Sequence, residues 1–243
     1  MKKGLIIAAA LTATLILGSG TPHAAALFTD DFTSGPSSQW GNEAGDWYVD
    51  NGVYNARQPS NGTNGTMTYT SLSYILRDFV IKVDMNSASD GGIWLRSGFP
   101  SHPLGNISGV LLVVGGSLSG YSQMYFHIFE NGVITNTSSL FGNFSTGDNL
   151  RVRVEVSGDT YTAHAFRGTE DVGSMTFTTD KFFSGQVALY DYSPGSVGTN
   201  YNLTFDNVVL NAVPLPSTLL LLGSGLLGLA AAGRRRRSRD WET

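Results

Sequence analysis

Short segments in which apolar and polar residues alternate dominate the middle of this chain. In residues 79–85 every second position is Phe, Ile, Val or Met, and residues 151–156 repeat the pattern with three valines. A period of two places alternate side chains on opposite faces, so each segment is predicted to be a β-strand with one buried face. Further strands are predicted at 92–96, 110–114, 124–130, 160–166, 186–190 and 203–210. No amphipathic helix is predicted outside the two terminal segments.

Turn residues separate these strands. Asn51-Gly52, Asn131-Gly132 and Ser157-Gly158-Asp159 stand between alternating runs, and Asn and Gly accept the positive φ angles that tight hairpin turns need. Many short strands joined by Gly-rich turns are typical of two packed antiparallel sheets. We therefore expect an all-β, two-sheet antiparallel sandwich.

The N-terminal segment, residues 1–26, predicts export. It begins with Lys2 and Lys3, continues as an apolar run over residues 5–17 and ends in small residues up to Ala26. A basic start, a short apolar core and a small-residue end make a secretory signal peptide. We expect cleavage after Ala26.

The C-terminal segment, residues 213–243, has three parts in a fixed order. Pro214, Leu215 and Pro216 come first, an apolar run follows over residues 219–232, and four arginines close it: Arg234, Arg235, Arg236 and Arg237. The apolar run covers only ~21 Å as a helix, short of a ~30 Å hydrocarbon core, unless residues before it contribute. By the positive-inside rule the arginines stay in the cytoplasm and the body lies outside. A transmembrane helix is expected here.

This order of Pro-x-Pro motif, apolar helix and Arg cluster resembles the PEP-CTERM sorting signal of Gram-negative bacteria. Leu215 stands where the commonest form of the signal has Glu. The resemblance implies an exosortase-type membrane protease as partner, which would cut near the motif and send the body to the cell envelope or extracellular matrix. Apolar length and flanking charge alone leave open an uncleaved anchor in the inner membrane.

The body between these segments, residues 27–212, suits a single all-β domain. It holds eight Lys and Arg against 17 Asp and Glu, a formal charge of −9, whereas the whole chain carries −4. A body this acidic argues against a nucleic-acid partner. Because the chain has no cysteine, disulfides, thiolate nucleophiles and Cys-ligated zinc are excluded.

Three stretches of the body carry a further resemblance: the opening Leu27–Phe32 with Trp40 and Gly45–Gly52, the strand Asp90–Arg96 and the closing strand Leu203–Leu210. Together they resemble concanavalin A-like jelly-roll domains of the laminin-G and DUF1080 (3-keto-disaccharide hydrolase-like) kind. The resemblance implies that the first and last strands lie side by side and that ligands sit on a concave sheet.

The alternation of apolar and polar positions identifies the side chains that would lie on that sheet. If Ile93, Leu95, Phe126 and Ile128 form the core, then Trp94, Arg96, Tyr125 and His127 face outward. Aromatic rings stack on sugar C–H faces and a guanidinium pairs with hydroxyl or carboxylate oxygens, so these four predict a polysaccharide-binding surface. The alternative is that Trp94 packs in the interior and Arg96 is a solvated charge or an internal ion-pair partner.

Catalytic motifs are sparse. No Gly-x-Ser-x-Gly occurs, and the body contains only four glutamates, of which Glu130 and Glu155 are the pair that could converge for glycoside hydrolysis. A divergent glycan-processing hydrolase therefore stays an alternative to a binding protein, as does a structural matrix protein with no specific ligand.

Structural calcium is the one metal that the sequence suggests, and no organic cofactor is predicted. Asp30, Asp31 and Asp206 would be neighbours if the first and last strands pair, and carboxylates are ligands that calcium prefers. The alternative is that these aspartates cap turns and strand ends.

Overall fold

The computed structural model describes residues 26–57, 61–62, 66–99, 107–118, 121–192 and 202–213. Residues 1–25 of the predicted signal peptide and all of the predicted sorting segment beyond Val213 lie outside these residues. Within the described residues, no helix is long and apolar enough to cross a membrane.

The described residues form sixteen β-strands joined by turns and loops. In chain order these strands are β1 Phe28–Asp30, β2 Trp40–Ala44, β3 Asp46–Asp50, β4 Val53–Arg57, β5 Asn61–Gly62, β6 Thr66–Leu72, β7 Phe79–Asn86, β8 Gly91–Gly98, β9 Ser108–Leu118, β10 Tyr121–Glu130, β11 Val133–Phe141, β12 Leu150–Ser157, β13 Thr160–Arg167, β14 Glu170–Thr178, β15 Gln186–Asp191 and β16 Thr204–Ala212.

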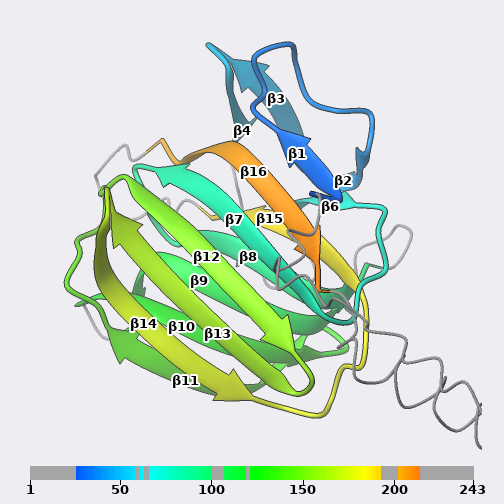
Figure 1. Ribbon diagram of the computed structural model, residues 1–243, viewed down its shortest axis with the longest axis vertical. Coiled ribbons are helices and arrows are strands. Elements are labelled where there is room, and N and C mark those ends of the chain that lie inside the picture. Colours follow the sequence, from blue (N-terminus) through cyan, green and yellow to red (C-terminus); the bar gives the residue numbers. More distant parts are fainter. Residues whose placement is uncertain are drawn as a thin grey trace, which may run out of the picture.

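The strands make two stacked antiparallel sheets (Figure 1). Sheet I has the order β14-β13-β12-β7-β16-β4-β3, with β1 added to β16. Sheet II has the order β11-β10-β9-β8-β15-β6-β2, with β5 added to β6. The predicted all-β, two-sheet sandwich is confirmed.

The local predictions hold closely. Each strand expected from alternation lies within an observed strand, apart from Leu203 at the edge of the last. Asn51 and Gly52 both have positive φ, as do Asn131 and Gly132, which is the backbone that two-residue hairpin turns require. The first and last strands pair as expected, with Phe28 opposite Leu210 and Asp30 opposite Val208.

One hydrophobic core fills the space between the sheets. In β7 the apolar positions are buried and the intervening positions are partly or fully exposed, which is the pattern that the sequence predicts. Sheet II contributes the four expected core residues, Ile93, Leu95, Phe126 and Ile128, all in the main cluster. A second set of apolar side chains of sheet II points to its other face, where the candidate site lies.

Candidate functional site

A second hydrophobic cluster covers the face of sheet II that points away from the core. Its buried members are Ala44, Tyr69, Trp94, Ile107, Leu111, Val113, Tyr125, Phe129, Ala188 and Tyr190, with Met67, Phe99 and Tyr192 partly buried against it. Register places these side chains on one surface, because Trp94 lies opposite Leu111 and Ala188 in its two neighbouring strands. We call this set the outer cluster.

Aromatic rings make up most of the outer cluster. The Trp94 ring lies 5.0 Å from that of Phe129 and 6.3 Å from that of Tyr190, both edge-on. The ring centroids of Tyr69 and Phe99 lie 4.4 Å apart, with the ring planes tilted by 30°. The outward face of an antiparallel sheet commonly carries polar residues that meet water, so a buried aromatic cluster on this face departs from that pattern.

Two of the four predicted ligand-binding residues, Trp94 and Tyr125, belong to this layer, but neither is a free surface side chain. Trp94 is 0% exposed and Tyr125 is 5% exposed. Both rings lie on the expected outward face of sheet II, but they are buried there rather than open to solvent. Among the described residues the Nε1 of Trp94 has no hydrogen-bond partner, which is uncommon for a buried donor.

The polar rim of the outer cluster is formed by Asp90, which the sequence reading did not single out. The Tyr125 hydroxyl donates a 2.8 Å hydrogen bond to Asp90 Oδ1. Asp90 is half-buried, and burial raises the pKa of its carboxyl while the bond from Tyr125 opposes that shift. Gly116 lies so close that a Cβ there would stand 2.4 Å from the Tyr125 hydroxyl oxygen. A positive φ of 54° at Asp90 turns the chain into β8.

His127 shares the outer face, where it is half-buried beside Tyr125 and Phe129. Its Nδ1 lies 2.7 Å from the Thr137 hydroxyl. Burial lowers the pKa of His127 to about 4, so the ring is neutral at pH 7 and offers one donor and one acceptor.

Arg96 does not join this surface, which corrects the fourth assignment. The pairing of β8 with β9 shifts between Leu95 and Gly98, and Arg96 has a φ of 47°. This bulge turns the side chain inward, where its guanidinium lies 5.3 Å from the Tyr161 ring of sheet I. Alternation fails at a bulge because one extra residue reverses the facing of those that follow.

The buried Arg96 guanidinium ties neighbouring segments together. Its Nε donates to the Arg77 carbonyl at 2.7 Å, and its Nη1 donates to the Phe182 carbonyl at 2.9 Å. Its Nη2 pairs with Asp78 Oδ1 at 3.2 Å. The Arg96 side chain is only 1% exposed. Arg96 is therefore an internal ion-pair partner, which is the alternative that the sequence left open.

The predicted calcium site is not found. The described residues contain no group of three His, Asp or Glu side chains placed to hold a metal ion together. The Asp30 carboxylate instead accepts from the Phe32 and Ser37 amides, at 3.0 and 2.8 Å, and from Trp40 Nε1 at 2.8 Å. Three N–H donors satisfy the charge that calcium would have balanced.

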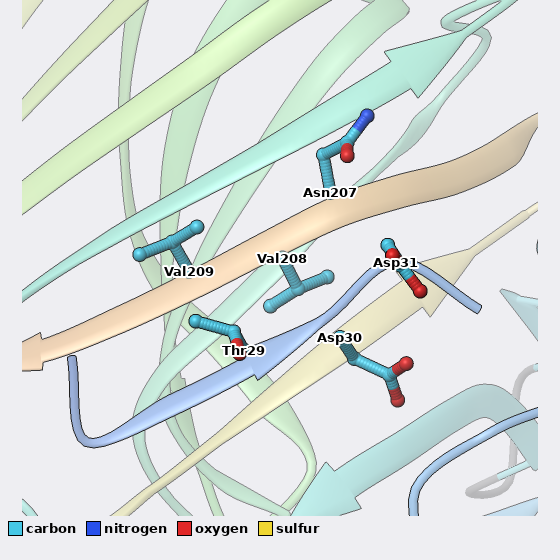
Figure 2. Close-up of a pocket in the computed structure, with 6 residues that line it drawn as sticks. All are labelled: Thr29, Asp30, Asp31, Asn207, Val208 and Val209. Carbon is cyan, nitrogen blue, oxygen red and sulfur yellow. The ribbon is translucent and has the colours of Figure 1, made fainter. Parts of the chain in front are cut away.

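A shallow pocket of about 260 Å³ lies where β1 meets β16, lined by Thr29, Asp30, Asp31, Asn207, Val208 and Val209 (Figure 2). The view shows Asp30 and Asn207 projecting away from each other rather than toward one point. Asp31 accepts from the amide and hydroxyl of Thr33. The pKa of Asp206 is raised, first by burial and then by the charges of Asp84, Asp31 and Asp30, so these aspartates are near but not convergent.

The two candidate catalytic glutamates, Glu130 and Glu155, lie in different sheets of the sandwich. Glu130 ends β10 in sheet II and binds Thr135 and Lys181. Glu155 lies in β12 of sheet I and pairs with Arg153 at 2.6 Å on the outward face. Glycoside hydrolysis needs two carboxylates across one bond, so this pair does not serve it.

Comparison with a protein-family model decides what the C-terminal segment is. Residues 212–237 match the PEP-CTERM protein-sorting motif. The chain carries a PEP-CTERM sorting signal. The match spans Pro214, Leu215 and Pro216 as well as the four arginines, Arg234 to Arg237, so the resemblance expected from the sequence is confirmed even though these residues lie outside the described ones. The PEP-CTERM motif implies export and sorting to the cell surface.

Comparison with solved structures identifies the fold of the body. The carbohydrate-binding module CBM66 of Bacillus subtilis is 17% identical, with 72% of this chain and 96% of that chain covered, at a TM-score of 0.51. The exoplasmic/lumenal domain of VIP36, bound to Ca²⁺ and Man3GlcNAc, is 10% identical over 77% and 89% at 0.54. A β-glucanase of Bacillus licheniformis is 11% identical over 77% and 98% at 0.51. At such identities the likeness shows a concanavalin A-like sandwich fold alone. The search of curated proteins found no match.

Proposed function

We propose that this PEP-CTERM protein is exported with residues 1–26 as signal peptide, and that its body, residues 27–212, binds polysaccharide in the cell envelope or extracellular matrix. The observation that carries the proposal is the outer cluster, an aromatic layer on the outward face of sheet II with a carboxylate at its rim. Aromatic faces suit sugar C–H groups, and Asp90 offers an acceptor for sugar hydroxyls. The similar folds include a carbohydrate-binding module and a domain bound to an oligosaccharide.

Within that surface the contacts fall to different residues than the sequence suggested. Asp90, His127 and Tyr192 are each partly exposed beside the buried rings. Trp94 and Tyr125 would support them from beneath, with the Tyr125 hydroxyl fixing the Asp90 carboxylate. Arg96 takes no part, since its side chain is enclosed between the sheets.

Asp90→Asn tests the proposal, because it removes the acceptor charge while keeping the shape. The probe is a polysaccharide array that includes the host strain's own exopolysaccharide. We expect affinity to fall by about tenfold, the value of one hydrogen bond to a charged group. Lys82→Gln is the matched control, because Lys82 is exposed on the outward face of sheet I. Equal binding by Asp90→Asn and wild type would move the site elsewhere. No binding to any polysaccharide would favour a structural matrix protein without a specific ligand.

The sorting step is proposed to run through an exosortase-type protease that recognises Pro214-Leu215-Pro216 after the C-terminal helix has entered the inner membrane. The apolar run and the arginines that follow it support that insertion. C-terminal mass spectrometry of the exported protein, in strains with and without the protease, tests the step. A mature protein that lacks Arg234 to Arg237 only when the protease is present is expected. Recovery of Thr243 on the exported protein would establish an uncleaved anchor instead.

A further inference from the structure

Large apolar side chains are exposed at one end of the sandwich. Within the described residues the exposed large hydrophobics, with their exposed fractions, are Leu27 39%, Ile75 68%, Val133 62%, Ile134 48%, Phe183 65% and Val213 36%. Pairing and hydrogen bonds place all of them at the end where β16 finishes. We call this set the apolar pole.

The chain termini of the body define this end. The Leu27 amide donates to the Leu210 carbonyl, and the Val213 amide donates to the Asp78 carbonyl just before β7 begins. Leu76 forms a bridge with Gly185, which brings the segments carrying Ile75 and Phe183 together. The arrowheads of β12 and β16 point toward this end, at the lower right of Figure 1.

The hairpin between β10 and β11 joins the same end. Glu130 closes β10, and its carboxylate binds the Lys181 ammonium at 2.6 Å, two residues before Phe183. Val133 and Ile134 follow at the start of β11. The Arg96 guanidinium donates to the carbonyls of Arg77 and Phe182, and so it holds in place the two segments that carry Ile75 and Phe183.

If the C-terminal segment is inserted in a membrane, the length of the linking chain limits how far the apolar pole can lie from that membrane. Only residues 214–218 separate Val213, a member of the pole, from the apolar run that begins at Leu219. Six Cα–Cα steps span at most roughly 20 Å when fully extended. While the anchor is uncut, Val213 therefore stays within this distance of the start of the apolar run, and the end of the body that carries the pole stays close to the membrane.

We propose that the apolar pole docks on the lipid–water interface of the membrane that holds the C-terminal helix, so that the body stands on the bilayer with its strands pointing away from it. The proposal rests on the membrane insertion proposed above. Charge does not drive the contact, because Lys181 is paired with Glu130 and Arg77 is paired with Asp78. Burial of the exposed Phe, Ile, Leu and Val side chains supplies the attraction, which the short tether strengthens by keeping the pole at the surface.

The absence of cysteine allows a clean test with single labels. The full chain is reconstituted into vesicles of phosphatidylcholine and phosphatidylglycerol at about three to one, with a nitroxide lipid as quencher near the headgroups. An environment-sensitive fluorophore is attached at Phe183→Cys or Val133→Cys on the pole. Ser145→Cys is the matched control, because Ser145 is exposed at the opposite end, in the loop after β11.

We expect strong quenching and a blue-shifted emission at positions 183 and 133, and neither change at 145. Adding Ile75→Ser to the Val133→Cys chain should lower the ratio of docked to free body by about tenfold, since ~1.4 kcal/mol is less than full burial of one Ile side chain is worth. Equal quenching at both ends, in chains that float with the vesicles, would overturn the docking proposal alone. Failure to float with the vesicles would overturn the membrane anchor and this proposal with it.

Discussion

Replacement of Arg96 by Met is the most decisive test of how this sandwich is held together. Met keeps most of the side-chain volume but removes every donor. The carbonyls of Arg77 and Phe182 then lose their partners, at about 1–3 kcal/mol each, and the contact with the Tyr161 ring is lost as well. We expect the free energy of unfolding to fall by about 3–5 kcal/mol, a large share of a typical 5–15 kcal/mol.

Urea unfolding followed by tryptophan fluorescence measures this change. Arg153→Met is the matched control, because Arg153 is partly exposed and pairs with Glu155 on the outward face of sheet I. Exposed pairs contribute about 0–1 kcal/mol, so the control should unfold close to wild type. An Arg96→Met protein as stable as the control would refute the structural role. A stable variant that lost glycan binding would restore Arg96 to the ligand surface.

Four smaller changes probe other parts of the molecule. Burial raises the pKa of Asp191 to about 8, so the folded chain keeps a proton that the unfolded chain releases above about pH 4. Stability should therefore fall as pH rises between about 4 and 8, by up to ~1.4 kcal/mol per unit, and Asp191→Asn should remove that slope in unfolding series. The pKa of His127 is lowered to about 4, so its NMR titration should have a midpoint near that value. Because the unfolded chain binds this proton more readily, the free energy of unfolding should fall as pH drops below about 6.5. An NMR midpoint near about 6.5 would show that the ring is open to solvent. Asp30→Asn should cost about 1.5–3 kcal/mol in chemical unfolding, because an amide replaces one oxygen that accepts N–H bonds. Gly116→Ala should lower thermal stability, at a cost of about 1–3 kcal/mol, because its Cβ would meet the Tyr125 hydroxyl, and an unchanged melting temperature would contradict that crowding.

The sequence predicts the fold well where one face of a strand is buried. Apolar and polar residues alternate in 79–85 and 151–156 because one face of each strand packs in the core. These two segments are the paired inner strands β7 and β12 of sheet I. The strands β2 to β6, β11 and β14 were missed. Of these, β2, β3, β11 and β14 form the edges of the two sheets, where a single neighbour buries less of each strand. Residues 133–141 are mostly Thr, Ser and Asn, which carry no strong period of two.

The site was harder to predict because two local features override alternation. At Arg96 a bulge with positive φ reverses the facing of the side chain, and no residue type in Gly92–Arg96 announces it. At Trp94 alternation gave the right face but the wrong exposure, since the outward face of sheet II carries its own cluster. A signal for that cluster was present in the apolar residues on both faces of 110–114, a pattern typical of strands that are buried on two sides.

The sorting signal and the proposed glycan site can be related through the direction of the strands. Asp90 immediately precedes β8 at one end, and Gly98 ends the strand beside the apolar pole, so the eight Cα–Cα steps between them span roughly 26 Å. If the pole rests on the membrane, Asp90 lies at the far end of β8, where envelope polysaccharide would be met. Arg96 lies in the same strand, near the pole. Its buried guanidinium donates to carbonyls of the segments that carry Ile75 and Phe183, so it holds these two parts of the pole together. Cutting at Pro214-Leu215-Pro216 would then release a body whose Asp90 end already pointed away from the bilayer.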